Sequence, residues 1–136
     1  MPPAPVGPPD PHGIAPAAAR LGNSARKNGK AGFAILGSLL ADGEVVEALC
    51  VGRFHDQAGL CAVTNQRLVV LGDGPYKPAV ATFEYAADLA VQGWADDKVA
   101  ALVFTRGDHN ETIDRIPDRP LAQEIAQRVR GHIAAV

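Results

Sequence analysis

Hydrophobic residues recur at helical spacing in the C-terminal segment from 118 to 133. Apolar positions three and four residues apart lie on one face of a helix, so this segment is predicted to be an amphipathic helix. Asp118 is a favourable residue at a helix start, Pro120 is tolerated in a first turn, and Gly131 lies near the end. The apolar stripe comprises Leu121, Ala122, Ile125, Ala126, Val129 and Ile133. Such a stripe needs a partner surface, which an open corner of a sheet provides.

Between residues 45 and 116 the pattern changes to short runs of β-forming residues separated by turn residues. The turn signals include the segments 55–59 and 72–75, and Gly107 is expected to supply a hairpin turn. The predicted strands are 45–54, 60–64, 67–71, 79–85, 89–94, 99–106 and 111–116. Strands at this spacing without intervening helices predict a mainly β fold, an antiparallel sandwich or barrel of about seven strands.

The N-terminal part has a different composition. Residues 1–19 contain most of the eleven prolines, and residues 20–30 are polar. A chain so rich in proline is expected to be extended and mobile. Residues 1–30 are therefore predicted to be a disordered tail and linker, and residues 31–136 a single domain. That domain is expected to open with a short helix at 32–41, which Asp42-Gly43 ends.

The net charge and the length of the chain exclude some classes of function. The chain has 136 residues, enough for one domain, and its net charge of −2 argues against a general nucleic-acid binder. The basic residues of the tail are Arg20, Arg26, Lys27 and Lys30, whereas the remainder of the chain is acidic. The segment 32–41 is too short to span a bilayer, and no secretory signal is recognisable. A cytoplasmic location is expected.

Two segments resemble bacterial pleckstrin-homology-like (PH-like) domains of the YokE-like family. The segment Leu39-Leu40-Ala41-Asp42-Gly43-Glu44-Val45-Val46 is similar to the helix and "GE-V" entry of that family. The segment from Gly59 to Val70 is similar to its "G-x-x-x-x-T-x-x-R-L-x-x" hairpin, with Thr64 and Arg67 at the fixed positions. The resemblance covers about residues 33–133. It implies seven antiparallel strands capped by a C-terminal helix, and a binding or assembly module, not an enzyme.

Candidate catalytic and metal-binding residues are sparse. Cys50 and Cys61 lie on successive predicted strands and could approach each other, but a zinc site needs about four ligands, so buried core residues are the favoured interpretation. The pairs His55-Asp56 and Asp108-His109 lie in predicted turns, where polar residues are expected, and no nucleophile motif accompanies them. No catalytic residue, metal or cofactor is predicted, and an enzyme of unknown class is the weakest hypothesis.

Binding residues are predicted at Arg53, His55, Arg67 and Trp94. Trp94 is either an exposed anchor for a partner or a residue at the rim of the core. The favoured hypothesis is a protein-interaction or self-association module that uses an exposed sheet edge or the groove beside the C-terminal helix.

The alternative is a peripheral membrane protein whose Arg26, Lys27, Lys30 and Arg53 contact anionic lipid. Inositol-lipid-binding PH domains carry several basic residues around the first hairpin. Residues 51–57 depart from that pattern because they offer Arg53, His55 and an opposing Asp56.

Overall fold

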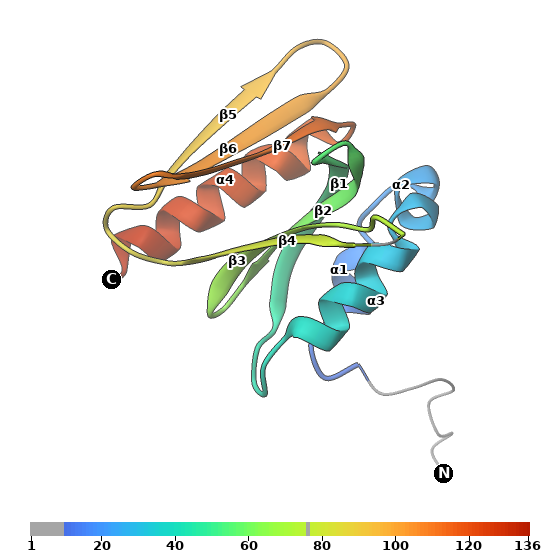
Figure 1. The fold of residues 1–136 in the computed structure, drawn as a ribbon, viewed down its shortest axis with the longest axis horizontal. Helices are drawn as coiled ribbons and strands as arrows, with labels where there is room; N and C mark the ends of the chain where they lie inside the picture. Colours follow the sequence, from blue (N-terminus) through green and yellow to red (C-terminus); the bar gives the residue numbers. More distant parts are fainter. Residues whose placement is uncertain (1–9, 76) are drawn as a thin grey trace.

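The protein folds into an antiparallel sheet flanked by helices at both ends of the chain (Figure 1). The computed structural model describes residues 10–75 and 77–136. Three short helices precede the sheet: α1 (Ile14–Ala18), α2 (Asn23–Asn28) and α3 (Lys30–Leu39). The strands are β1 (Val46–Phe54), β2 (Gln57–Thr64), β3 (Arg67–Gly72), β4 (Ala79–Glu84), β5 (Ala90–Ala95), β6 (Ala100–Arg106) and β7 (His109–Ile116), and helix α4 (Arg119–Ala134) follows.

The seven strands form one sheet in the order β4-β3-β2-β1-β7-β6-β5. Two antiparallel meanders, β1–β4 and β5–β7, meet where Arg53 of β1 lies opposite Asp114 of β7. In Figure 1 the two meanders form separate layers, with α4 against both. The predicted fold class, seven antiparallel strands with a C-terminal helix and a short helix before the sheet, is confirmed. This is the PH-like arrangement.

Helix α4 closes the open side between the two meanders. Five of the six residues of its predicted stripe are buried, Ile125 and Val129 fully so, and Ile133 is partly buried. The helix contacts β1, β2, β5 and β6. Asp118 caps the helix: its side chain accepts a hydrogen bond from the Leu121 amide at 3.1 Å. The sequence therefore predicted the helix, its N-terminal cap and its position over an open corner of the sheet.

Strands β1 and β2 are covered on both faces. Cys50 lies directly opposite Cys61, and both thiols are free and buried, as expected of core residues. Burial raises the pKa of the Cys61 thiol, and the neighbouring Cys50 adds to the effect. On the other face α3 packs closely, because a side chain at Gly32 would lie 2.7 Å from Leu60 Cδ2. The sheet is thus held between α4 on one side and the N-terminal helices on the other.

The structure differs from the sequence-based expectation over residues 10–30. This segment was expected to be a disordered tail and linker, but it forms α1 and α2, and Ala17, Leu21 and Ala25 are buried. The carbonyl of His12 also accepts a hydrogen bond from the Val46 amide at 2.8 Å. The apolar residues that anchor the segment are few, and two of the three, Ala17 and Ala25, are small, so the segment shows little apolar pattern. The expectation for residues 1–9 lies outside the described residues.

The third helix is close to its predicted position. It spans Lys30–Leu39, against the expected 32–41, and Gly43 after it has the left-handed φ of 79° expected at such a stop. Across residues 10–75 and 77–136, no helix combines the length and the apolar character that a bilayer crossing requires.

Candidate functional site

A groove of about 410 Å³ separates α4 from the β5–β6 hairpin. Its helical side presents Arg119 and Arg130 near the two ends, with small residues between them. With a rise of about 1.5 Å per residue, these arginines define a groove about 16 Å long. The lining residues that matter most are Trp94 and Gly93 from β5, Leu102 from β6, and Ala122, Gln123 and Ala126 from α4.

One wall of this groove is an edge of the sheet, because β5 is the last strand in the order formed by residues 10–75 and 77–136. The Asp96 amide donates to the Val99 carbonyl at 3.0 Å, so Asp96 faces β6. In an antiparallel ladder the backbone groups alternate in direction. The N–H and C=O groups of Gly93 and Ala95 therefore point away from β6, toward the edge.

The two arginines of the groove are hydrogen bonded to this edge strand and to the turn that follows it. Arg130 Nη2 donates to the Val91 carbonyl at 3.1 Å, and Arg119 Nη1 donates to the Asp96 carbonyl at 2.7 Å. Each guanidinium has five N–H donors, so donors remain for a ligand. Neither residue was predicted to bind. The spacing of these two arginines in the sequence could have indicated them, because it places both side chains on one face of α4.

Trp94 is 61% exposed and lines the groove. Of the two interpretations left open by the sequence, the exposed residue is the one that the structure shows. An exposed tryptophan beside an unpaired strand edge is a suitable anchor for a partner, because aromatic side chains contribute strongly to interface energies.

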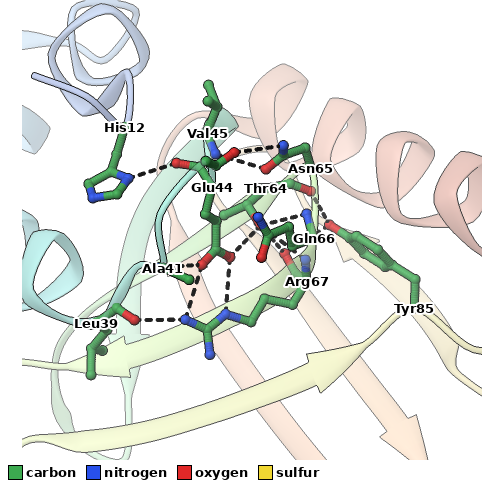
Figure 2. A network of polar contacts seen from close by, with 11 residues as sticks. His12, Leu39, Ala41, Glu44, Val45, Thr64, Asn65, Gln66, Arg67 and Tyr85 are labelled. Atoms are coloured by element: carbon green, nitrogen blue, oxygen red, sulfur yellow. Dashed lines mark hydrogen bonds and ion pairs between the residues drawn. The ribbon is translucent and has the colours of Figure 1, made fainter.

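Arg67 lies elsewhere, in a network of polar contacts between the β2–β3 turn and the loop after α3 (Figure 2). At its centre is the carboxylate of Glu44, which is fully buried. Arg67 donates to it from Nε at 3.0 Å and from Nη2 at 3.1 Å. Thr64 Oγ1 donates at 2.7 Å and the Ala41 amide at 3.0 Å. The guanidinium is thus largely committed to an internal contact.

Further hydrogen bonds tie three more segments to the same network. Arg67 Nη2 also donates to the Leu39 carbonyl at 2.8 Å, at the end of α3. His12 Nδ1 donates to the Glu44 carbonyl at 2.7 Å. The Tyr85 hydroxyl lies 2.7 Å from the Thr64 carbonyl, and burial raises the pKa of Tyr85. The network therefore joins the N-terminal segment, α3 and the sheet.

We expect the free energy of unfolding to decrease at acid pH as Glu44 becomes protonated. Burial alone would raise the pKa of Glu44, but the hydrogen bonds from Arg67, Ala41 and Thr64 and the charge of Arg67 lower it below its ordinary value. A carboxyl with a depressed folded-state pKa contributes stability that is complete above its unfolded pKa of about 4.3 and is lost as pH falls through the folded value. We expect the wild-type urea midpoint to fall between about pH 5 and pH 3 more steeply than that of Glu44→Gln.

A matched control for this pH series is Asp88→Asn. The Asp88 side chain is 65% exposed in its ion pair with Arg106, so that pair contributes little to the free energy of unfolding. The control should retain most of the wild-type slope. Equal slopes for wild type and Glu44→Gln would show that the buried carboxylate is not the titrating group.

His55 is brought next to His109 by the two hairpin turns at one end of the sheet. His55 Nε2 lies 3.0 Å from Glu111 Oε1, and His109 Nε2 lies 3.0 Å from Glu111 Oε2. Burial opposes ionisation of Glu111, but these hydrogen bonds lower its pKa overall. His55, Asp56 and Asp108 lie in turns, as predicted, whereas His109 is the first residue of β7. Over the described part of the chain, no group of three or more His, Cys, Asp or Glu residues is arranged to hold a metal ion.

The predicted electrostatic residues gather around α2. Arg26 and Lys27 are exposed on α2, and Lys30 is exposed at the start of α3. Arg53 lies beside the same helix, because it shares a pocket with Ser24 and Asn28. The structure therefore brings Arg53 next to the helix that carries Arg26 and Lys27. His55 lies in the turn that Arg53 contacts, whereas Arg67 and Trp94 lie in two other places.

Comparison with known proteins gives a similarity to a solved structure. Protein-family models gave no match, and curated proteins gave none. The crystal structure of a pleckstrin homology domain from Shewanella amazonensis SB2B is similar to this chain with a TM-score of 0.48 and 18% sequence identity. The similarity covers 74% of this chain and 94% of that chain. The PH-like assignment rests on the strand order and the C-terminal helix described above.

Proposed function

We propose that this chain is a non-enzymatic protein-binding module, and that an extended segment of a partner protein docks along β5 in the groove beside α4. The observation that supports this most directly is the edge of β5, which no other strand in the described part of the chain pairs with and which faces a groove with Trp94 exposed on its wall. An extended segment gains main-chain hydrogen bonds by adding a strand to such an edge, and side-chain pockets then supply specificity. Membership of the YokE-like group is part of this proposal and rests on the two sequence segments quoted above.

The length of the groove limits how many residues of the partner's extended segment can bind in it. A strand rises about 3.3 Å per residue, so a groove about 16 Å long accommodates about five extended residues. The wall between the arginines consists mainly of small side chains such as Ala122 and Ala126. Apolar side chains of the partner fit there, whereas an acidic side chain fits beside Arg119 or Arg130.

A binding function is also favoured over catalysis by the burial of the candidate reactive groups. Thr64 Oγ1 is hydrogen bonded to a carboxylate, the arrangement expected of an activated hydroxyl, but Thr64 and Glu44 are both fully buried. A substrate has no access to them without unfolding this corner. His55 and His109 are exposed, but both bond to the same carboxylate of Glu111.

The test compares three variants of the full chain. Peptides selected by the wild-type protein from a displayed random library supply the probe, and their affinity is measured by fluorescence anisotropy. Trp94→Ala should weaken binding by about tenfold or more, because truncation of an aromatic anchor costs about 2 kcal/mol. Gly93→Pro removes an edge-facing N–H, which an edge strand tolerates, and should weaken binding similarly. Gly93→Ala is its control, since the added carbon would lie 3.6 Å from Leu102 in ordinary contact.

The outcomes separate the parts of the proposal. Loss of binding in Trp94→Ala and Gly93→Pro, with binding retained in Gly93→Ala, supports strand addition in the groove. Wild-type affinity in Gly93→Pro contradicts main-chain pairing, and wild-type affinity in Trp94→Ala contradicts the groove. Light scattering of the same proteins identifies a second copy of the chain as the partner if a wild-type oligomer dissociates in Trp94→Ala.

A further inference from the structure

The groove beside α4 is positively charged, although the protein as a whole is not. Its charged lining residues are both arginines, Arg119 and Arg130, whereas the net charge of the chain is −2. In the described part of the chain, no salt bridge joins either arginine to a carboxylate. The carboxylate of Asp96, in the turn after β5, instead accepts hydrogen bonds from the Lys98 and Val99 amides at 2.7 and 2.8 Å. The groove is therefore complementary to an acidic ligand.

One of these arginines also limits strand pairing along the edge of β5. In the alternating ladder, the backbone groups of Val91, Gly93 and Ala95 point away from β6. The Val91 carbonyl already accepts a hydrogen bond from Arg130 Nη2 at 3.1 Å. A docked segment therefore pairs readily with Gly93 and Ala95, but it has to displace Arg130 to pair with Val91 as well.

The register of such a segment follows from the same alternation. The side chain of Val91 is buried, so positions 91, 93 and 95 face the inner side of the sheet, on which α4 packs. Residues directly opposite each other in an antiparallel pair have their side chains on the same face. The three residues of a docked segment that lie opposite Val91, Gly93 and Ala95 therefore face the helix. The middle one lies over Gly93, which has no side chain, and beside Ala122 and Ala126, so an apolar side chain fits there.

The outer two of these three positions lie next to the two guanidiniums. Arg130 is hydrogen bonded to the Val91 carbonyl itself, and Arg119 to the carbonyl of Asp96, one residue beyond Ala95, at 2.7 Å. Residues four apart in a strand are separated by about 13 Å. A carboxylate is a stronger acceptor for a guanidinium than a neutral carbonyl is. A carboxylate at either outer position therefore draws the arginine away from the backbone, and at Val91 this exchange frees a carbonyl for one more main-chain hydrogen bond.

We propose that the partner segment carries two carboxylates four residues apart with an apolar residue midway between them, in the pattern acid-x-apolar-x-acid. This inference rests on the proposed docking along β5 and adds the chemistry of the partner. Arg119 and Arg130 bind the two outer side chains, and the apolar side chain fills the space over Gly93. Carboxylates three residues apart lie on opposite faces of an extended segment, so they leave one arginine without a partner.

The experiment titrates the full chain, labelled with ¹⁵N, with three pentapeptides that have acetyl and amide ends. The paired peptide is Glu-Thr-Val-Thr-Glu, the rearranged peptide Glu-Thr-Val-Glu-Thr has the same composition and charge, and Gln-Thr-Val-Thr-Gln is neutral. We expect the paired peptide to bind about tenfold more tightly than the rearranged one, the difference expected for one charge-assisted contact. The neutral peptide should bind more weakly than either. Amide chemical shifts should change at Gly93, Trp94 and Ala95.

Two variants show whether the arginines cause this preference. Arg119→Gln and Arg130→Gln should each weaken binding of the paired peptide by about tenfold. In either variant the preference for the paired over the rearranged peptide should disappear, because only one arginine remains. Damage to the groove would instead weaken both peptides and preserve the preference.

Arg106→Gln is the matched control, because Arg106 is paired with Asp88 and does not line the groove. It should keep the tenfold preference. A preference that is present in the wild type and lost in both groove variants supports the pair of carboxylates. Equal binding of the paired and rearranged peptides by the wild type, a preference that survives in both variants, or no binding of the paired peptide up to about 10 mM overturns the inference. The proposed function is judged separately, since library-selected peptides that bind the wild type and not Gly93→Pro would still support strand addition along β5.

Discussion

Replacing Arg67 with alanine is expected to lower the free energy of unfolding by about 3 to 5 kcal/mol, the cost of removing one partner from a buried ion pair. The carboxylate of Glu44 is fully buried and would keep only the hydrogen bonds from Thr64 and Ala41. The contact between the β2–β3 turn and the Leu39 carbonyl would also be lost. Urea unfolding at pH 7, followed by circular dichroism, measures the change.

A double-mutant cycle shows whether the loss arises from the unpaired charge. Glu44→Gln removes the charge and keeps a side chain of similar shape. The double variant Arg67→Ala with Glu44→Gln should therefore be more stable than the sum of the two single losses predicts, by at least about 1 kcal/mol. Arg106→Ala, at an exposed ion pair, is the control and should cost less than about 1 kcal/mol. A loss below about 1 kcal/mol for Arg67→Ala would contradict a structural role for the pair.

A chain that begins at residue 31 is expected to be less stable than one that begins at residue 10, by about 2 kcal/mol or more. The shorter chain lacks α1 and α2, and burial of the Leu21 side chain alone is worth about 1.5 to 3 kcal/mol. It also lacks Arg20, whose Nη1 and Nη2 contact the Glu124 carboxylate at 2.9 and 2.6 Å. Urea unfolding of both chains gives the difference.

The shorter chain should also self-associate, because removal of α2 uncovers Val51 on the outer face of the sheet. A side chain at Gly29, the residue between α2 and α3, would lie 3.1 Å from Val51 Cγ1, so this face is closely covered in the full chain. Light scattering at increasing protein concentration measures the association. If both chains are equally stable and monomeric, the domain boundary lies near residue 30, as the sequence alone suggested.

Much of the sheet could be predicted because a strand or helix that is buried on one side has a periodic pattern of apolar residues in its own sequence. The predicted strands from 67–71 to 99–106 lie within one residue of the observed ones at most ends. Gly107, expected in a hairpin turn, has a φ of 60° between β6 and β7. Turn glycines and apolar periodicity act over a few residues, so a single sequence is sufficient to recognise them.

The N-terminal helices were not predicted, because their burial depends on contacts with a sheet whose residues lie far away in the sequence. Leu21 is buried as part of the same core as the sheet, yet its own segment is polar. Proline content describes the average tendency of a segment, whereas a few buried contacts with a folded sheet are sufficient to order it. Pro16 lies within the first turn of α1, where it costs no helical hydrogen bond.

The sequence by itself determined the number of strands, the C-terminal helix with its cap, and the burial of Cys50 opposite Cys61, because each follows from local spacing. Only the tertiary structure decided which polar residues meet. Glu44 forms an ion pair with Arg67 across a loop and a hairpin. Arg119 and Arg130 line a groove against β5, and Arg53 and Arg115 line a pocket beside α2. These contacts depend on strand register and on how the helices pack, and neither is encoded in the pattern of a single segment.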